Sequence, residues 1–217
     1  MTLEIKKRII TSIFLFLILF CMFIDNNFLI GVLFIASSIA FFEFINLQIK
    51  INKRNKINLC LFSGLFLLYL LFFSIFFYAL MLAPHTRIFL FITVLICIAS
   101  DVSGLIFGKL FKGKKLTKIS PNKTISGSLG SFIGSFLIIS LFIYFNLVGS
   151  SYHLIVYTFF TSLFCQLGDI FISYLKRKAK VKDTGNLLPG HGGILDRLDG
   201  ILFGIPFGVF SFYVINI

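Results

Sequence analysis

The 217-residue sequence contains no tryptophan, only four prolines and only eight acidic residues. Charged residues make up 13% of the chain and hydrophobic residues 58%, including 31 phenylalanines. This composition excludes an ordinary soluble domain, in which about a quarter of the residues are charged. The scarcity of proline and the lack of low-complexity tracts argue against a disordered tail or a long linker. We therefore expect an integral membrane protein with a single domain, residues 1–217.

The cysteines and the positive charge argue against two further kinds of function. Each of the four cysteines lies alone in an apolar segment, without a Cys-x-x-Cys pair or a histidine at ligand spacing. The net charge of +12 comes from lysines and arginines in short segments beside apolar stretches, where anionic headgroups and membrane topology account for them. We expect the lipid bilayer, and no nucleic acid, as the partner of these cations.

Apolar stretches long enough to cross a bilayer fill most of the chain. A transmembrane helix needs about 20 apolar residues, and such stretches lie at 9–24, 28–47, 59–82, 88–107, 129–148, 154–175 and 198–217. The predicted fold class is all-α: a polytopic integral membrane protein with about seven transmembrane helices and two long polar cytoplasmic loops. Glycines at a spacing of four in the fifth and seventh stretches favour close helix packing.

The number of lysines and arginines alternates between high and low in successive connections between the apolar stretches. They gather in the N-terminal flank and at 50–56, 109–123 and 176–197. The positive-inside rule places these segments in the cytoplasm and the C-terminus outside. The frequent Phe, Ile, Lys and Asn suggest an AT-rich bacterial genome, so the predicted location is a bacterial cytoplasmic (inner) membrane, crossed several times, with the N-terminus and the active site in the cytoplasm.

Three of the acidic residues, Glu43, Asp101 and Asp169, lie in or at the end of apolar stretches. A carboxylate at a helix centre costs about 2.5–3.5 kcal/mol on insertion scales, so it should face protein, water or a cation. We interpret Glu43 as paired with a lysine or near the interface. Asp169 is a functional candidate, and for Asp101 a functional and a structural role have equal weight.

The run from Ser173 to Asp199 is polar and carries both signs of charge between two apolar stretches. Mg²⁺ is normally held by one or two carboxylates together with phosphate oxygens, and Lys and Arg neutralise the remaining phosphate charge. Asp196 and Asp199 are three residues apart, so a helix would present both on one face. With Asp169 they would form a divalent-metal site; alternatively, one or more of them pairs with Arg197 or Lys176.

Two further segments add polar groups. In the turn at 189–193, Gly192 and Gly193 permit the close backbone approach that phosphate-binding turns require. His191 in this turn acts as an acid or a base, donates a hydrogen bond to a phosphate, or only caps the loop. The earlier segment, 101–128, combines a field of lysines that attracts anions with a donor cluster. That cluster consists of Ser120, Pro121, Asn122, Lys123 and Thr124.

The later run resembles the signature of the phosphatidate cytidylyltransferase family, also called CDP-diacylglycerol synthase. The matching positions are Ser173, Leu175, Lys176, Arg177, Lys182, Asp183, Gly185, Leu188, Pro189, His191, Gly192, Gly193, Ile194, Asp196, Arg197, Leu198 and Asp199. The earlier segment is similar to the family's Ser-Pro-x-Lys-Thr motif at 120–124, but Ile125 and Ser126 stand where an aromatic residue and Glu are usual.

The resemblance implies that CTP and phosphatidic acid are the substrates, with Mg²⁺ required and a second cation left open. It implies a catalytic part at 96–217 and generic spans at 1–95, and leaves a homodimer open. The implied metal ligands are Asp169, Asp196 and Asp199, with Asp183 as a further ligand or a partner of one. The implied triphosphate-binding cations are Lys176, Arg177, Lys182 and Arg197. The implied substrate-binding residues are Asp101, Ser120, Pro121, Lys123, Thr124, Gly192 and Gly193, and His191 is a catalytic candidate.

Three alternatives remain at this point. The sequence Asp-Arg-Leu-Asp-Gly at 196–200 imitates the start of the CDP-alcohol phosphotransferase motif, but no charge follows in 201–217. A CTP-dependent lipid kinase is closer, although the uninterrupted later motif argues against it. A transporter or channel would also place acids in the membrane, but such proteins usually show repeated halves, which this sequence lacks.

Overall fold

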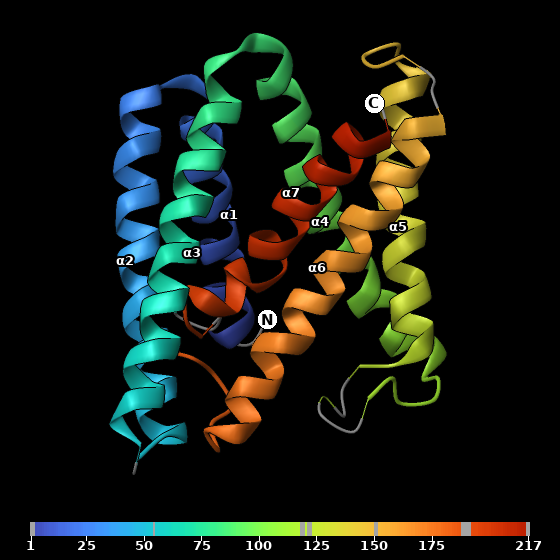
Figure 1. Ribbon diagram of the computed structural model, residues 1–217. Helices are drawn as coiled ribbons and strands as arrows, with labels where there is room; N and C mark the ends of the chain where they lie inside the picture. Colours follow the sequence, from blue (N-terminus) through green and yellow to red (C-terminus); the bar gives the residue numbers. More distant parts are fainter. Residues whose placement is uncertain are drawn as a thin grey trace. The chain divides into compact units, whose positions relative to one another are not determined.

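The computed structural model describes residues 3–53, 55–117, 120, 123–149, 152–187 and 192–215. In these ranges the regular structure is helical, apart from an isolated bridge between Lys115 and Thr124. The helices, labelled in Figure 1, are α1 (Leu3–Ile24), α2 (Asn26–Ile51), α3 (Lys56–Leu82), α4 (Pro84–Phe111), α5 (Ile125–Tyr144), α6 (Tyr152–Lys178) and α7 (Leu195–Ile215). The prediction of an all-α chain with about seven helices is confirmed.

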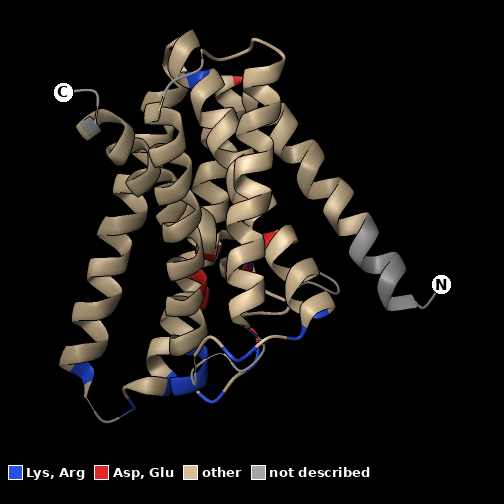
Figure 2. Cartoon of the chain, turned by 90° about the vertical axis from the view of Figure 1, so that its right-hand side faces the viewer, with Lys and Arg blue, Asp and Glu red and all other residues tan. Residues whose placement is uncertain are grey.

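The helices have the length and surface of a polytopic membrane protein. Among the described residues, α2 to α7 are long and apolar enough to cross a membrane, and α1 contributes a shorter apolar segment, Ile10–Ile24. Only 28% of the apolar window of α2 and 50% of that of α7 is buried within the protein. Lysines and arginines lie in connections and near helix ends rather than along the apolar helix walls (Figure 2).

The chain forms two compact units, and each contains segments that are distant in sequence. The first unit comprises Met1–Arg87 and Leu175–Leu198, and the second comprises Ile88–Tyr174 and Asp199–Ile217. Helices α6 and α7 therefore contribute residues to both units. The single domain inferred from the sequence stays a prediction.

In the first unit, α2 contacts both α1 and α3. Phe44 of α2 stacks on Phe66 of α3 with ring centroids 3.9 Å apart, and the Ser37 and Ser74 hydroxyls lie 3.0 Å apart between the same helices. The buried face of α2 includes Ala40, Phe44 and Leu47, and Glu43 belongs to the same face. The packing of α2 thus directs a carboxylate into the protein rather than towards lipid.

In the second unit, small residues bring the helices close together. A Cβ atom on Gly168 of α6 would overlap the backbone oxygen of Asp199 in α7, and one on Gly208 would overlap Thr161 of α6. A Cβ atom on Gly134 of α5 would likewise overlap Ser103 of α4. The close packing that the glycine spacing predicted is therefore present, because a larger residue at these positions would push the helices apart.

The packing at Gly168 can be tested by adding one methyl group. In Gly168→Ala the new Cβ meets a backbone oxygen that cannot rotate away, so we expect a loss of stability of about 1–3 kcal/mol. The measurement is the thermal unfolding midpoint of the detergent-purified protein. Gly64→Ala in α3 is the control, because no atom lies within 4 Å of its added Cβ; equal midpoints for the two variants would contradict the packing argument.

Candidate active site

The last turn of α6 carries basic side chains, and the helix ends in a defined backbone turn. The Val181 amide donates to the Lys176 carbonyl and the Lys180 amide to the Arg177 carbonyl, both at 3.0 Å. With Lys180 at a φ of 57°, these bonds form a Schellman motif, in which the residue after the helix is left-handed. Lys176, Arg177 and Lys178 occupy the last turn of α6, where the helix dipole favours positive charge.

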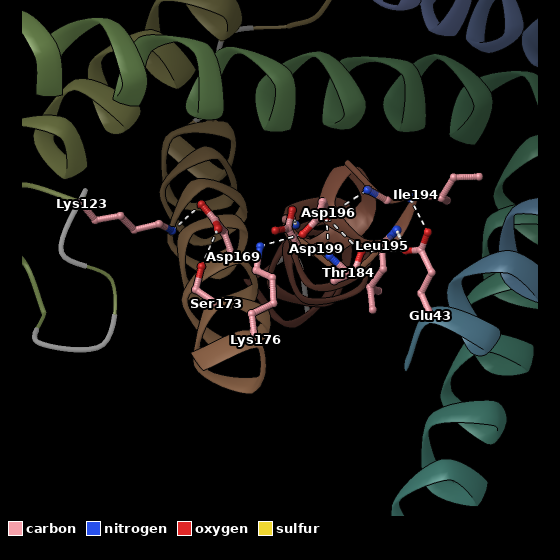
Figure 3. Close-up of polar contacts among 12 residues, drawn as sticks. Glu43, Lys123, Asp169, Ser173, Lys176, Thr184, Ile194, Leu195, Asp196 and Asp199 are labelled. Atoms are coloured by element: carbon pink, nitrogen blue, oxygen red, sulfur yellow. Dashed lines mark hydrogen bonds and ion pairs between the residues drawn. The ribbon is translucent and has the colours of Figure 1, made fainter. Parts of the chain in front are cut away.

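The carboxylate of Asp196, in the first turn of α7, joins the end of α6 to the connection that follows it (Figure 3). Its Oδ1 accepts a hydrogen bond from Lys176 Nζ at 2.6 Å. Its Oδ2 accepts from the backbone amides of Thr184 at 2.8 Å and Gly193 at 3.0 Å. Because these donors lie at three separate points of the sequence, Asp196 joins the end of α6, Thr184 and the residue pair that precedes α7.

Glu43 of α2 is a second carboxylate that binds this connection, and only 5% of the residue is exposed. Its Oε1 accepts from the Ile194 amide at 3.0 Å, and its Oε2 accepts from the Leu195 amide at 2.9 Å and from the Thr184 hydroxyl at 2.7 Å. Helix α7 begins at Leu195 after an isoleucine that has no side-chain acceptor, so Glu43 caps the helix in its place. The sequence-based interpretation of Glu43, a lysine partner or an interfacial position, missed these partners.

The glycines of the turn leave room for these acids. Gly192 has a φ of +84°, a backbone conformation that glycine adopts without strain. A Cβ on Gly193 would overlap the Thr184 hydroxyl and the Glu43 carboxylate, and a Cβ on Gly185 would also overlap Glu43. The close approach that the sequence predicted for a ligand at Gly193 is thus made by a carboxylate of the chain itself, and ligand binding there stays a prediction.

Asp169 of α6 forms an ion pair with Lys123 in the connection from α4 to α5 (Figure 3). The Ser173 hydroxyl, one turn later in α6, donates to Asp169 Oδ1 at 3.4 Å. The side chains of Asp169 and Lys123 are 33% and 22% exposed, so solvent screens the pair and its contribution to stability is about 0–1 kcal/mol. The ion pair instead sets a position, because it joins the earlier polar segment to α6.

Two further acids lie on helices that contact α6 and each other in the second unit. A Cβ on Gly200 of α7 would lie 3.5 Å from Asp101 Oδ2 of α4. Asp199 is buried, and its Oδ1 accepts from the Gly200 amide at 2.9 Å. Because Gly168 packs against the Asp199 backbone, Asp169, Asp199 and Asp101 occupy neighbouring turns of three packed helices.

The described residues of the earlier polar segment are joined by several hydrogen bonds within the segment. Thr124 caps α5, with its hydroxyl oxygen accepting from the Gly127 amide at 3.1 Å and lying 3.0 Å from the Ser126 hydroxyl. Ser120 is buried, and its carbonyl accepts from the Lys123 amide at 3.1 Å. These contacts account for the fold of the segment, while phosphate binding by Ser120, Lys123 and Thr124 stays a prediction.

The remaining predicted residues divide by their exposure. The exposed ones are Arg177, Lys182, Asp183 and Arg197. Pro121 and His191 lie outside the described residues.

Asp196 belongs to the first unit, and Asp169 and Asp199 belong to the second. Among the described residues, no three His, Cys, Asp or Glu side chains form a group that could hold a metal ion, so the three-carboxylate metal site stays a prediction.

Residues 52–215 match the model of the Cytidylyltransferase family. The chain belongs to this cytidylyltransferase family. A phosphatidate cytidylyltransferase of Helicobacter pylori is 41% identical over 116 residues, covering 51% of this chain and 42% of the relative. Proteins of the same name from Bacillus subtilis and Rickettsia typhi are 40% identical over 121 residues and 42% identical over 125 residues. These matches cover 55% and 54% of this chain and 45% and 53% of the relatives. The chain therefore spans about half the length of the curated relatives it matches.

For two residues that hold the connection between α6 and α7, the sequence did not predict their contacts. Glu43 precedes the residues matched by the family model, and its one signal was its position as a lone acid in an apolar stretch, which by default marks function. Thr184 lies within the resembling run, but no rule of spacing distinguished its hydroxyl. Both residues reveal their role only through contacts with the start of α7.

Removal of the Asp196 carboxylate should loosen the connection between α6 and α7. In Asp196→Ala the Thr184 and Gly193 amides lose their acceptor, and each buried donor left unsatisfied costs about 1–3 kcal/mol. We expect faster tryptic cleavage after Lys180 and Lys182 in the purified protein, measured by limited proteolysis with mass spectrometry.

The control for this experiment is Asp25→Ala. Asp25 accepts a hydrogen bond from the Asn27 amide at the start of α2, so its loss removes a carboxylate cap without touching the connection. Cleavage after Lys180 and Lys182 should then proceed as in the wild type. If Asp196→Ala is also cleaved at the wild-type rate, Asp196 does not hold the connection.

Proposed function

We propose that the chain is a phosphatidate cytidylyltransferase of phospholipid biosynthesis, which transfers CMP from CTP to phosphatidic acid and yields CDP-diacylglycerol and pyrophosphate. Family membership over residues 52–215 and the names of the relatives support this proposal. The structural observation that carries it is the pairing of a lysine with a carboxylate at two places, Lys176 with Asp196 and Lys123 with Asp169. Such pairs provide groups for phosphate and for a cation.

The proposed reaction is an in-line substitution at phosphorus. A phosphate oxygen of phosphatidic acid attacks the α-phosphorus of CTP, and the bond from this phosphorus to the oxygen that bridges it to the β-phosphorus breaks. Pyrophosphate leaves with that oxygen and its electron pair. The protein needs no strong base, because a phosphate monoester is already largely ionised at neutral pH, so its residues act by positioning and by neutralising charge.

The cations at the end of α6 and the start of α7 are proposed to hold the triphosphate. They are Lys176, Arg177, Lys182 and Arg197. The earlier segment is proposed to contact a phosphate of the lipid or of the nucleotide through Ser120, Lys123 and Thr124. Lys123 and Lys176 are already aligned by their carboxylate partners, which supports their assignment as preorganised phosphate ligands.

The acids fit the donor set that Mg²⁺ prefers, carboxylate oxygens together with substrate phosphate oxygens. The proposed ligands are Asp169, Asp196 and Asp199. Among the described residues, Asp196 Oδ2 accepts from two backbone amides and lies 3.0 Å from the Thr184 hydroxyl oxygen, whereas Oδ1 accepts from Lys176. Oδ1 is therefore the less occupied of the two oxygens and the one proposed to face the metal. The metal would supply neutralisation of phosphate charge, and Asp183 is proposed as a further ligand or as a partner of one.

The proposed location is the cytoplasmic membrane of a bacterium, with the N-terminus and the site in the cytoplasm. The distribution of Lys and Arg between the connections supports this orientation. It would expose the cations at 176–197 to soluble CTP, while phosphatidic acid would reach the site from the bilayer.

The proposal predicts CTP-dependent formation of CDP-diacylglycerol by membranes that contain the expressed chain. Chelation with EDTA should abolish the product and added Mg²⁺ should restore it, because phosphate charge would otherwise lack its metal partner. Product is measured as radiolabel from CTP that enters the lipid fraction. Absence of product under conditions in which the Bacillus subtilis relative is active would refute the proposal.

Asp199→Asn tests the metal assignment at one residue. The amide keeps the size of the buried side chain but removes its charge, so we expect turnover to fall roughly 100-fold while the thermal unfolding midpoint stays close to that of the wild type. Asp25→Asn, at the start of α2, is the matched control and should keep full turnover. Wild-type turnover in Asp199→Asn would exclude Asp199 as a metal ligand.

A further inference from the structure

We infer that Glu43 is a positioning residue of the site: its carboxylate sets the location of Thr184 and of the first turn of α7, and thereby of Asp196. The functional part of this inference rests on the proposed cytidylyltransferase activity. Glu43 lies in α2, nine residues before the segment matched by the family model begins at residue 52. Neither the matched segment nor the resembling run contains it.

The first support is the way the buried charge is satisfied. An ionised carboxylate removed from water is costly unless hydrogen bonds or opposite charge stabilise it. Glu43 takes part in neither the Lys123–Asp169 nor the Lys176–Asp196 ion pair. Its partners are instead the Ile194 and Leu195 amides and the Thr184 hydroxyl. The positive end of the α7 dipole also favours a negative charge at this position.

The second support is that the contact is specific in geometry. Each carboxylate oxygen accepts from a different backbone amide, Oε1 from Ile194 and Oε2 from Leu195. The two bonds together fix the rotation of the carboxylate as well as its distance from α7. Gly185 and Gly193 flank it so closely that a Cβ on either residue would overlap it. The surroundings therefore admit one carboxylate orientation.

The third support is a direct connection to Asp196. Thr184 donates its backbone amide to Asp196 Oδ2 at 2.8 Å and its hydroxyl to Glu43 Oε2 at 2.7 Å. The hydroxyl oxygen also lies 3.0 Å from Asp196 Oδ2, but a hydroxyl has one proton to donate, and Glu43 is the nearer acceptor. Thr184 therefore joins the two acids, and Leu195, which Glu43 binds, is the immediate neighbour of Asp196.

The decisive variant is Glu43→Gln, which keeps the shape of the side chain. One of its terminal atoms becomes an N–H donor that faces a backbone N–H, so one of the two amide bonds is lost. We expect the KM for CTP to rise and kcat/KM for CTP to fall about 10- to 100-fold, as is typical when the partner of a ligand is removed or a site shifts slightly. The KM for phosphatidic acid should stay unchanged. Hydrogen exchange at 192–195, measured by mass spectrometry, should accelerate.

Ser37→Ala is the matched control. It removes a polar contact between α2 and α3 without touching the connection, so the kinetic constants and the exchange at 192–195 should equal those of the wild type. A purely structural loss in Glu43→Gln would lower the amount of active protein but would not change KM. Thr184→Val, which removes one hydroxyl at nearly constant volume, is the second variant if Glu43→Gln fails to fold, and it should raise the KM for CTP in the same direction.

The outcomes separate this inference from the proposed function. If the wild type makes CDP-diacylglycerol and both Glu43→Gln and Thr184→Val retain its kcat and its KM for CTP, the positioning role is overturned. If the wild type makes no CDP-diacylglycerol, the proposed function fails, and hydrogen exchange still decides the inference. Faster exchange at 192–195 in Glu43→Gln would then support the positioning role of Glu43, and unchanged exchange would overturn it.

Discussion

The arrangement of the later polar run depends on how the first backbone amides of α7 are satisfied. A helix leaves its first amides without internal partners, and in a membrane protein water cannot be relied on to supply the missing acceptors. The residue before α7 is Ile194, whose side chain has no acceptor for these amides. Glu43 supplies one from α2, and Asp196 supplies another to the Gly193 amide just outside the helix. Two carboxylates thus determine where α7 starts.

In the second unit, the helix packing depends on glycines, which have no side chain at the points of contact between helices. Gly168 lets α6 approach the backbone of α7, and Gly200 of α7 faces Cys165 of α6 and the Asp101 carboxylate of α4. This close packing gives Asp169, Asp199 and Asp101 positions on neighbouring turns of the packed helices. Larger residues at these glycines would separate the helices and move the acids apart. Glycine therefore positions carboxylates here, although it carries no functional group.

Hydropathy and segment length predicted the number and type of the helices, because lipid imposes both. Their ends were less predictable: α2 extends to Ile51 and α4 to Phe111, since polar residues continue a helix beyond the hydrocarbon layer. The local motif identified Asp196 as a candidate and the position in an apolar stretch identified Asp169, and the pairing of Asp196 with Lys176 was among the alternatives considered. The bond from Glu43 to Thr184 was not predictable, because it joins residues 141 positions apart and helix caps are ordinarily sought in neighbouring sequence.

The two lysine–carboxylate pairs, one in each unit, explain how each polar segment can contain charge beside apolar helices. A lone carboxylate or ammonium there would carry a large desolvation cost, whereas Lys176 with Asp196 and Lys123 with Asp169 are each neutral as a pair. A phosphate that approached either lysine would exchange one anionic partner for another instead of meeting an unpaired charge. The carboxylate released by that exchange would in turn be available to a cation. Neutral pairs of this kind hold the charged groups in position before any ligand binds, and Glu43 extends the same arrangement by fixing the backbone on which Asp196 stands.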